Sequence, residues 1–244
     1  MEQHQDIYTR KIINLIVRRR KEVGLSQIGL AERSGLPQST IARIETHRLH
    51  MRLDTLMKIL AVLDCDLSFA SNETIETKRL ILRKLTMDDA GAMFDGWCSD
   101  PDVAKYVTWN PHKSIDETKS ILSSWIKEYD SPDSIRYGIC LKNSGKLIGT
   151  IDVVDYINEN PEIGYCLAKG YWNNGYMTEA LKAFVSHLFR IGFNSIVIEA
   201  DVRNIASNRV IEKSGFKFMG KESKDHWSPF KAEPITVNWY QISF

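Results

Sequence analysis

The stretch from Pro161 to Glu179 carries residue types that bind a phosphorylated ligand through the backbone. An expected strand, 162–167, leads into a turn rich in glycine and asparagine, and an apolar helix follows over about 175–190. Backbone N–H groups in such a turn, at the start of a helix, form an anion site, and a pyrophosphate is a natural ligand. The turn has neither the Gly-Lys-Ser/Thr ending of a P-loop nor the three glycines of a dinucleotide fingerprint. It therefore favours a nucleotide ester other than ATP or NAD.

A second group of polar residues lies between Leu25 and Glu45, where two short helices are joined by a tight turn. Ala31 is small where the helices cross, and Gly35 is able to adopt the positive φ of the turn. Three apolar residues bury the second helix: Leu36, Ile41 and Ile44. Its polar residues are then left on the outside: Gln38, Ser39, Thr40 and Arg43. Short polar side chains at a helix N-terminus are able to reach base edges in the major groove of DNA.

This segment resembles the phage-repressor (XRE-type) family of helix-turn-helix domains over about residues 8–69. Leu-Ser-Gln-x-x-Leu-Ala opens the first helix of the motif, and Gln-Ser-Thr-Ile opens the second. The resemblance implies that Gln27 lies near a phosphate of double-stranded DNA and orients Gln38, which reads adenine. The further DNA contacts that it implies are Ser39, Thr40 and Arg43. It also favours a homodimer that reads two half-sites. Helix spacing alone leaves open an alternative, a helical bundle used for dimerisation or partner binding.

The elements that position these groups fall into two domains. Up to residue 67 we expect four helices, one ending near Gly24 and the others at 27–33, 37–45 and 53–63. The last of them carries a predicted apolar face: Leu53, Leu56, Met57, Leu60 and Leu63. After a polar connector, 68–76, we expect strands at 79–83, 136–141, 146–154, 162–167, 195–201, 216–220 and 235–242. The expected helices of this part are 87–100, 114–129, 175–190 and 206–214.

This order predicts an all-α helix-turn-helix bundle over residues 1–70 and an α+β domain over residues 74–244. The α+β domain has a mixed, largely antiparallel sheet flanked by helices. Residues 1–70 hold 11 basic against 8 acidic residues and residues 71–244 hold 21 against 23, so charges of +3 and −2 compose the net +1. A mildly basic small domain is compatible with binding to nucleic acid.

Composition narrows the class of protein further. No apolar run approaches the roughly 20 residues that span a bilayer, and the polar start, Met1 to Arg10, does not have the pattern of a secretory signal. The cysteines at positions 65, 98, 140 and 166 are scattered, without metal-ligand or redox spacing. We therefore expect a cytoplasmic protein with reduced thiols and no metal.

The residues after the connector resemble the GNAT superfamily of acyl-CoA-dependent N-acetyltransferases, in the subgroup similar to ribosomal-protein acetyltransferases. The superfamily binds the CoA pyrophosphate with Arg/Gln-x-x-Gly-x-Gly/Ala, which matches the six residues from Trp172 to Met177. Trp172, which the subgroup often carries, and the bulky Met177 depart from the superfamily consensus. Further matches fall in order at 76–83, at Tyr-Val-Thr-Trp-Asn-Pro over 106–111, and in the module 200–216.

The resemblance implies a role for each of a set of residues. Main-chain groups of Cys166 and Leu167 pair with the pantetheine arm of acetyl-CoA, and a backbone N–H near Tyr165 or Cys166 stabilises the oxyanion. Asn204, with Ser207 in the same module, contacts the arm from the other side. The pyrophosphate is cradled by Trp172, Asn173, Asn174, Gly175, Tyr176, Met177 and Thr178.

An attacking amine is protonated in water, so a base is required, and the Glu-Ile-Gly-Tyr block makes Glu162 the candidate. Asp152 is a candidate for positioning the amine.

Each of these side chains has a simpler interpretation as well. Glu162 is compatible with an exposed strand-edge carboxylate, Asp152 with a structural role, and Tyr165 with the core. Cys166 has no histidine nearby in sequence, and direct transfer needs no acyl-enzyme, so we do not expect a nucleophile there. His187 and His226 are interpreted as non-catalytic, with His226 and Trp227 as possible walls of an acceptor pocket. Three further tryptophans are interpreted as core or as acceptor-side wall: Trp97, Trp109 and Trp125.

The sequence thus predicts transfer of acetyl from acetyl-CoA to a primary amine, either a protein N-terminus or a small molecule. The DNA-binding module is expected to regulate transcription, including that of the chain's own operon. The alternative is a transcriptional regulator that senses acyl-CoA with a catalytically weak GNAT domain, for which Trp172 and Met177 are the signs of decay.

Overall fold

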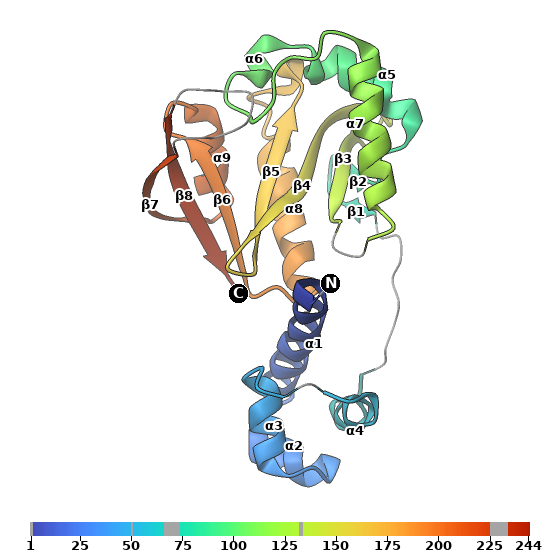
Figure 1. The fold of residues 1–244 in the computed structure, drawn as a ribbon, viewed down its shortest axis with the longest axis vertical. Helices are drawn as coiled ribbons and strands as arrows, with labels where there is room; N and C mark the ends of the chain where they lie inside the picture. Colours follow the sequence, from blue (N-terminus) through green and yellow to red (C-terminus); the bar gives the residue numbers. More distant parts are fainter. Residues whose placement is uncertain (1, 50, 66–73, 132–133, 225–233) are drawn as a thin grey trace. The chain divides into compact units, whose positions relative to one another are not determined.

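The computed structural model describes residues 2–49, 51–65, 74–131, 134–224 and 234–244, with only the backbone for 2–7 (Figure 1). The chain folds into two compact units. The first comprises residues 1–71 together with 188–194, and the second comprises residues 72–187 and 195–244.

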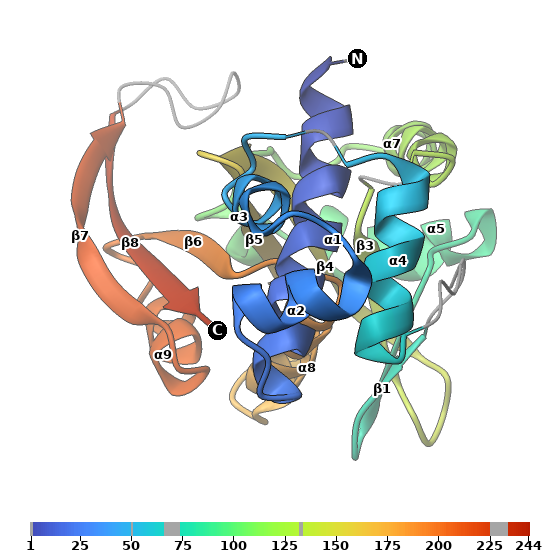
Figure 2. The same ribbon diagram turned by 90° about the horizontal axis from the view of Figure 1, so that it is seen from below.

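The first unit is built from four helices, as the sequence predicts. They are α1 (Glu2–Glu22), α2 (Gln27–Ser34), α3 (Gln38–Glu45) and α4 (Leu53–Leu63), and Figure 2 shows them around one another. Ser26 caps α2 by accepting a hydrogen bond from Gly29 N at 3.0 Å. Gly35 ends that helix with φ +67°, a conformation that favours glycine. The helices enclose a core of Ile13, Ile16, Leu30, Ala31, Ile41, Ile44, Leu56, Ile59 and Leu63.

The buried face of α4 differs from the predicted one. Leu56, Ile59 and Leu63 are buried, whereas Leu53 is 69% and Met57 is 52% exposed. The C-terminal half of α4 is apolar almost all round (Ile59, Leu60, Ala61 and Val62 follow one another), so its sequence fits two overlapping stripes. Packing against α1 and α2 selects the stripe that contains Ile59.

The second unit is an eight-stranded sheet with helices on both faces. Its strands are β1 (Ile75–Glu76), β2 (Leu80–Arg83), β3 (Arg136–Leu141), β4 (Leu147–Ile157), β5 (Asn160–Leu167), β6 (Ser195–Asp201), β7 (Lys217–Lys224) and β8 (Ile235–Ser243). Their order in the sheet is β1-β2-β3-β4-β5-β6-β8-β7, and every neighbouring pair is antiparallel except β5 and β6. The mixed, largely antiparallel sheet predicted from the sequence is confirmed.

Two groups of helices cover the sheet. Met93 of α5 (Ala90–Met93) and Leu122 of α7 (Ile115–Glu128) pack with Cys140 and Leu147 on one face. Phe184 of α8 (Tyr176–Arg190) packs edge-to-face on Tyr137, and α9 (Ile205–Lys213) follows β6.

The helix predicted over 87–100 is helical only to Cys98, and it has three hydrogen-bonding patterns. A 3₁₀ turn, η1 (Met87–Asp89), leads into α5, and a π-helical turn, η2 (Phe94–Cys98), follows before α6 (Pro101–Ala104). Glycines at 91 and 96 weaken the preference for a regular α-helix here. The 3₁₀ helix η3 (Lys169–Tyr171) precedes α8.

The sheet opens between β5 and β6. These strands share one pair of residues in register, Glu162 and Val197, and Figure 1 shows them parting toward their carboxyl ends. Because β5 and β6 diverge, no strand among the described residues pairs with this edge of β5 beyond Glu162. Such a gap at the carboxyl ends of strands is a frequent ligand-binding position in α/β proteins.

Candidate functional site

The register of β4 and β5 determines which main-chain groups of β5 face the gap. Ala168 N donates to Ile148 O at 2.8 Å, and the same register pairs Cys166 with Thr150 and Gly164 with Asp152. Antiparallel pairing alternates, so the amides of 164 and 166 point to β4, while those of Tyr165 and Leu167 point to the gap. Cys166 and Leu167 are the two residues predicted to pair with an extended ligand through the main chain. The register favours this role for Leu167 and for Tyr165, whose amides face the gap, and disfavours it for Cys166.

A turn at the carboxyl end of β5 presents further backbone donors. Asn173 (φ +60°) and Gly175 (φ +73°) both adopt left-handed conformations, and α8 begins directly after them. The Asn174 side chain donates to Trp172 O at 2.8 Å and closes the turn. N–H groups of the first helical turn have no carbonyl partner within the helix, so this end of α8 is suited to an anion.

The two residues of this turn that depart from the consensus do not obstruct it. The Met177 side chain is buried in the core, as are Ala180 and Leu181 of the same helix. Trp172 donates its indole N–H to the Leu167 carbonyl at 2.7 Å and is 37% exposed. Trp172 thus supplies a partner to a strand-end carbonyl and holds the turn against β5.

Glu162 lies half-buried at the residue pair where β5 and β6 part. Burial raises the pKa of its carboxyl to about 7, with a further contribution from the charge of Glu199, against the opposing charge of Lys224. Glu199 itself is held by an ion pair with Lys224. A carboxylate with a pKa near 7 is able to accept a proton at neutral pH. Glu162 is therefore not the fully exposed strand-edge carboxylate of the simpler interpretation.

Asp152 lies on the same face of the sheet as Glu162, because it opposes Gly164, which is two residues from Glu162 on β5. Its Oδ2 accepts a hydrogen bond from Arg136 Nε at 2.8 Å, while Oδ1 accepts none from any residue that the structure describes. Burial raises the pKa of Asp152, and the Arg136 charge only partly offsets this. Arg136 also donates to Glu128 at 2.7 Å and lies over the Trp125 ring at 4.3 Å.

Tyr165 joins β5 to the start of α9 on the other face. Its hydroxyl lies 2.8 Å from Ser207 Oγ, and burial raises its pKa further above the ordinary value. Asn204 caps α9 by accepting a hydrogen bond from Ser207 N at 3.1 Å. The structure thus brings Tyr165, Asn204 and Ser207 together beside the gap.

Several other sequence candidates lie in structural surroundings. Burial raises the pKa of Cys166 to about 11, and its Sγ lies 3.2 Å from Thr150 Oγ1, which disfavours a nucleophilic thiolate. His187 is buried edge-to-face against Tyr137, and Trp97 is buried in the core. Trp109 and Trp125 are half-buried against the same cluster as Cys166. His226 and Trp227 lie outside the described residues.

The structure also reveals side chains that the sequence analysis did not single out, Arg79, Arg136 and Arg20 among them. Each pairs with a carboxylate far away in sequence, so no local pattern marks it. Among the described residues, no group of three His, Cys, Asp or Glu side chains is arranged to hold a metal ion. No described helix is long and apolar enough to cross a membrane.

In the first unit, a hydrogen-bonded chain supports the polar end of α3. Arg20 pairs with Glu45 at 2.6 and 2.8 Å, Gln27 Nε2 donates to Glu45 Oε2 at 2.9 Å, and Gln38 Nε2 approaches Gln27 Oε1 at 3.5 Å. The pair of Arg20 and Glu45 is largely buried, with side-chain exposures of 10% and 7%. Gln38 and three neighbours on the outer surface of α3 are exposed or half-exposed: Ser39, Thr40 and Arg43.

Comparison with known proteins agrees with both units. A family model described as an acetyltransferase (GNAT) domain matches residues 79–217, and a helix-turn-helix model matches residues 16–69. The N-acetyltransferase YoaA of Bacillus subtilis is 34% identical over 149 residues, which cover 60% of this chain and 84% of that protein.

Two solved structures extend the comparison. A GNAT-family acetyltransferase from Bacillus anthracis has a TM-score of 0.61 at 26% identity, covering 70% of this chain and 98% of that one. RimL, a ribosomal L7/L12 α-N-protein acetyltransferase solved with coenzyme A, has a TM-score of 0.61 at 24% identity with the same coverage. The likeness to RimL shows the fold alone.

Proposed function

The chain belongs to the acetyltransferase (GNAT) family and carries a helix-turn-helix domain ahead of it, and on this premise we propose that it transfers acetyl from acetyl-CoA to a primary amine. The observation that carries the proposal is the gap between β5 and β6: β5 amides along it face no other strand among the described residues, and a turn suited to an anion lies at its end. This arrangement suits a ligand that has an amide-containing arm attached to a pyrophosphate.

Donor binding divides between the edge of β5 and the turn. The Tyr165 carbonyl and the Leu167 N–H pair with the pantetheine amides, and the turn from Trp172 to Thr178 holds the pyrophosphate. Asn204 and Ser207 contact the arm from the α9 side. Acetyl-CoA supplies an acyl group activated as a thioester, so the transfer requires no covalent enzyme intermediate.

Glu162 and Asp152 act on the acceptor. Asp152 is held by Arg136 through Oδ2, and its Oδ1 accepts a hydrogen bond from the incoming ammonium group. Glu162, with a pKa of about 7, takes the proton from that ammonium, directly or through one water, and leaves a nucleophilic amine. The Tyr165 amide N–H stabilises the negative charge that develops on the thioester oxygen as the amine attacks.

We propose that the first unit binds double-stranded DNA with α3 in the major groove. Gln38 reads a base while Gln27, fixed by Glu45, orients it and lies near a phosphate. Ser39, Thr40 and Arg43 make the adjacent contacts, and a homodimer places two such helices on two half-sites. Selection of bound sequences from a random DNA pool tests the assignment, and recovery of no enriched sequence would refute it.

The acceptor class is tested by transfer of labelled acetyl from acetyl-CoA into a cell extract, separated into protein and small-molecule fractions. Label in the protein fraction indicates a protein N-terminus or a lysine, the first in line with the acceptor that RimL's name states, and label in the small-molecule fraction indicates a metabolite or antibiotic amine. The Gly175→Glu variant serves as the inactive control. If acetyl-CoA binds but no label is transferred, the proposed enzyme activity is wrong and the chain is an acyl-CoA-sensing regulator.

A further inference from the structure

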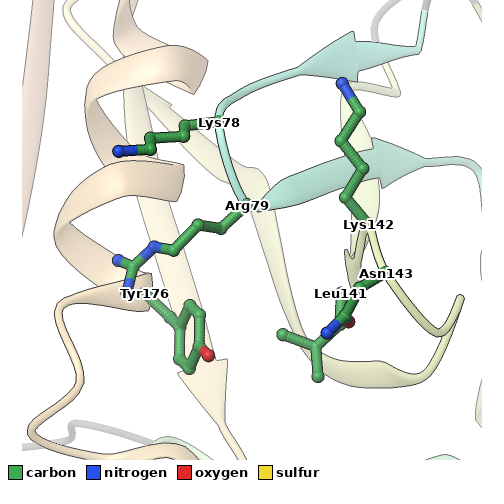
Figure 3. A pocket seen from close by; sticks show the side chains of 6 residues that line it. All are labelled: Lys78, Arg79, Leu141, Lys142, Asn143 and Tyr176. Carbon is green, nitrogen blue, oxygen red and sulfur yellow. The ribbon is translucent and has the colours of Figure 1, made fainter.

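A pocket of about 310 Å³ lies beside the anion-binding turn, on the side of β2 and β3 (Figure 3). It is lined by Lys78, Arg79, Leu141, Lys142, Asn143 and Tyr176. These residues come from three parts of the chain: the two residues before β2, the end of β3 with the two residues after it, and the first residue of α8. Three of the six carry a positive charge and none carries a negative one, so the lining is suited to an anion.

Two of the three cations have acidic partners outside the pocket lining. Lys142 Nζ pairs with Glu76 at 2.7 Å, with both side chains about half exposed, and Arg79 Nε pairs with Glu179 at 2.7 Å. Lys78 makes no ion pair with any residue that the structure describes. An exposed ion pair such as that of Lys142 contributes little, so this lysine is able to turn to a ligand at small cost.

Arg79 connects the pocket to the turn. Its Nη1 donates to Asn174 O at 3.0 Å, and the guanidinium lies over the Tyr176 ring at 4.3 Å. Nη2 lies 3.6 Å from the position that a Cβ of Gly175 would occupy, and it donates to no described residue. The guanidinium is therefore fixed beside Gly175, with one N–H edge left for a ligand.

Glu179 holds Arg79 in this orientation. Both its oxygens accept hydrogen bonds from Arg79, at 2.8 Å from the backbone N and at 2.7 Å from Nε, and Thr77 Oγ1 adds a third at 2.7 Å. Burial acts to raise the pKa of Glu179, but the hydrogen bonds from Thr77 and Arg79 outweigh it and the pKa is lowered. Glu179 thus stays ionised, and Arg79 keeps its place when a ligand enters.

We propose that this basic pocket binds the ribose 3′-phosphate of the CoA moiety, with Lys78, Lys142 and Arg79 Nη2 as its donors. The inference rests on the proposed function, because a pyrophosphate on the turn places the ribose one linkage away from Arg79. A phosphomonoester carries close to two negative charges at neutral pH, which matches a pocket lined by three cationic residues. The pocket therefore distinguishes CoA from 3′-dephospho-CoA.

The test compares the binding of CoA and of 3′-dephospho-CoA to the full chain by calorimetry in phosphate-free buffer. Charge-assisted hydrogen bonds to phosphate predict that the wild type binds CoA about tenfold or more tightly than dephospho-CoA. A Lys78→Gln/Lys142→Gln variant should lose that preference while its affinity for dephospho-CoA stays unchanged. The matched control is Lys213→Gln/Lys217→Gln, which removes the same charge from exposed positions on α9 and β7 and should keep the preference.

Each outcome is distinguishable from failure of the proposed function. If neither ligand binds, the proposed donor site is wrong. If both bind with equal affinity to the wild type, the pocket inference alone is wrong. Inorganic phosphate that binds together with intact CoA would show that the pocket serves a separate anion.

Discussion

Replacing Glu162 by glutamine removes the carboxylate that the mechanism requires and keeps the size of the side chain. The pKa of Glu162 is raised from 4.5 to about 7 by burial and by Glu199, so about a tenth of the carboxyl is ionised at pH 6 and about half at pH 7. If the ionised form is the base, kcat/KM of the wild type should fall about tenfold per pH unit below 7.

The glutamine variant should lack this acid limb, and at pH 8 its rate should be lower by about 10²- to 10⁴-fold, the range typical of general bases. The assay follows release of the CoA thiol from acetyl-CoA, with acetyl-CoA affinity measured separately by calorimetry. Affinity for acetyl-CoA should not change, because Glu162 faces the acceptor. Glu222→Gln, an exposed carboxylate on β7, is the matched control. If Glu162→Gln has the same rate and the same pH profile as the wild type, Glu162 is not the general base.

Stability provides an independent measurement on the same variant. The folded pKa of Glu162 lies above its ordinary value, so folding favours the protonated form. The contribution of the Glu162 carboxyl to the free energy of unfolding is therefore fully present below pH 4.5 and is lost as pH rises through about 7. Glu162→Gln cannot ionise, and it should therefore melt at a higher temperature than the wild type at pH 8. A variant that is less active yet more stable would exclude misfolding as the cause of lost activity, whereas equal melting at all pH values would contradict the assigned surroundings of Glu162.

Three further predictions concern the turn and the first unit. Gly175→Glu should abolish acetyl-CoA binding in calorimetry, because φ is +73° there and the new carboxylate would enter the anion site beside Arg79; retained binding would reject the turn as the pyrophosphate site. Gln38→Ala should weaken specific DNA binding by about 1–3 kcal/mol in a fluorescence titration without changing acetyl transfer. If specific and non-specific DNA are affected alike, Gln38 does not read a base. Arg20→Met should cost about 3–5 kcal/mol in the denaturation of the first unit, because it leaves the buried Glu45 carboxylate without its cation, with the hydrogen bond from Gln27 remaining. A loss below 1 kcal/mol would show that Glu45 finds water or another donor.

Local signals in the sequence predicted most of the fold. Ser26 and Gly35 mark the ends of α2 because capping depends on adjacent residues, and the strand at 136–141 and the helix at 53–63 agree with the structure. The orientation of α4 was wrong because its apolar residues fit two faces, and only its neighbours decide between them. The helix predicted over 87–100 divides into three hydrogen-bonding patterns, because glycines at 91 and 96 weaken the preference for a regular α-helix that the apolar spacing indicates.

The site was predictable in its position and less so in its contacts. The turn after 162–167 could be found because its glycine, its asparagines and the following apolar helix are contiguous in sequence. Which amides of β5 face the gap, those of Cys166 or of its neighbours, could not be predicted from the sequence, because the direction of an amide depends on the register of β5 with β4. The pair of Arg79 and Glu179 joins residues 100 positions apart, which no local pattern indicates.

The departures from the GNAT consensus at Trp172 and Met177 argue against a decayed site. An anion bound by a turn is held by backbone N–H groups, so a side chain in the turn matters only through its effect on the backbone. Met177 is buried in the core, and Trp172 donates to the carbonyl of Leu167, so both residues stabilise the conformation that aims those groups. Loss of function would relax such constraints, yet Asn173 and Gly175 keep the left-handed conformations that the turn requires. The hydrogen bond from Trp172 joins the turn to Leu167, whose N–H faces the gap. This contact couples the position of the pyrophosphate to the edge of β5, and such coupling favours catalysis over sensing alone.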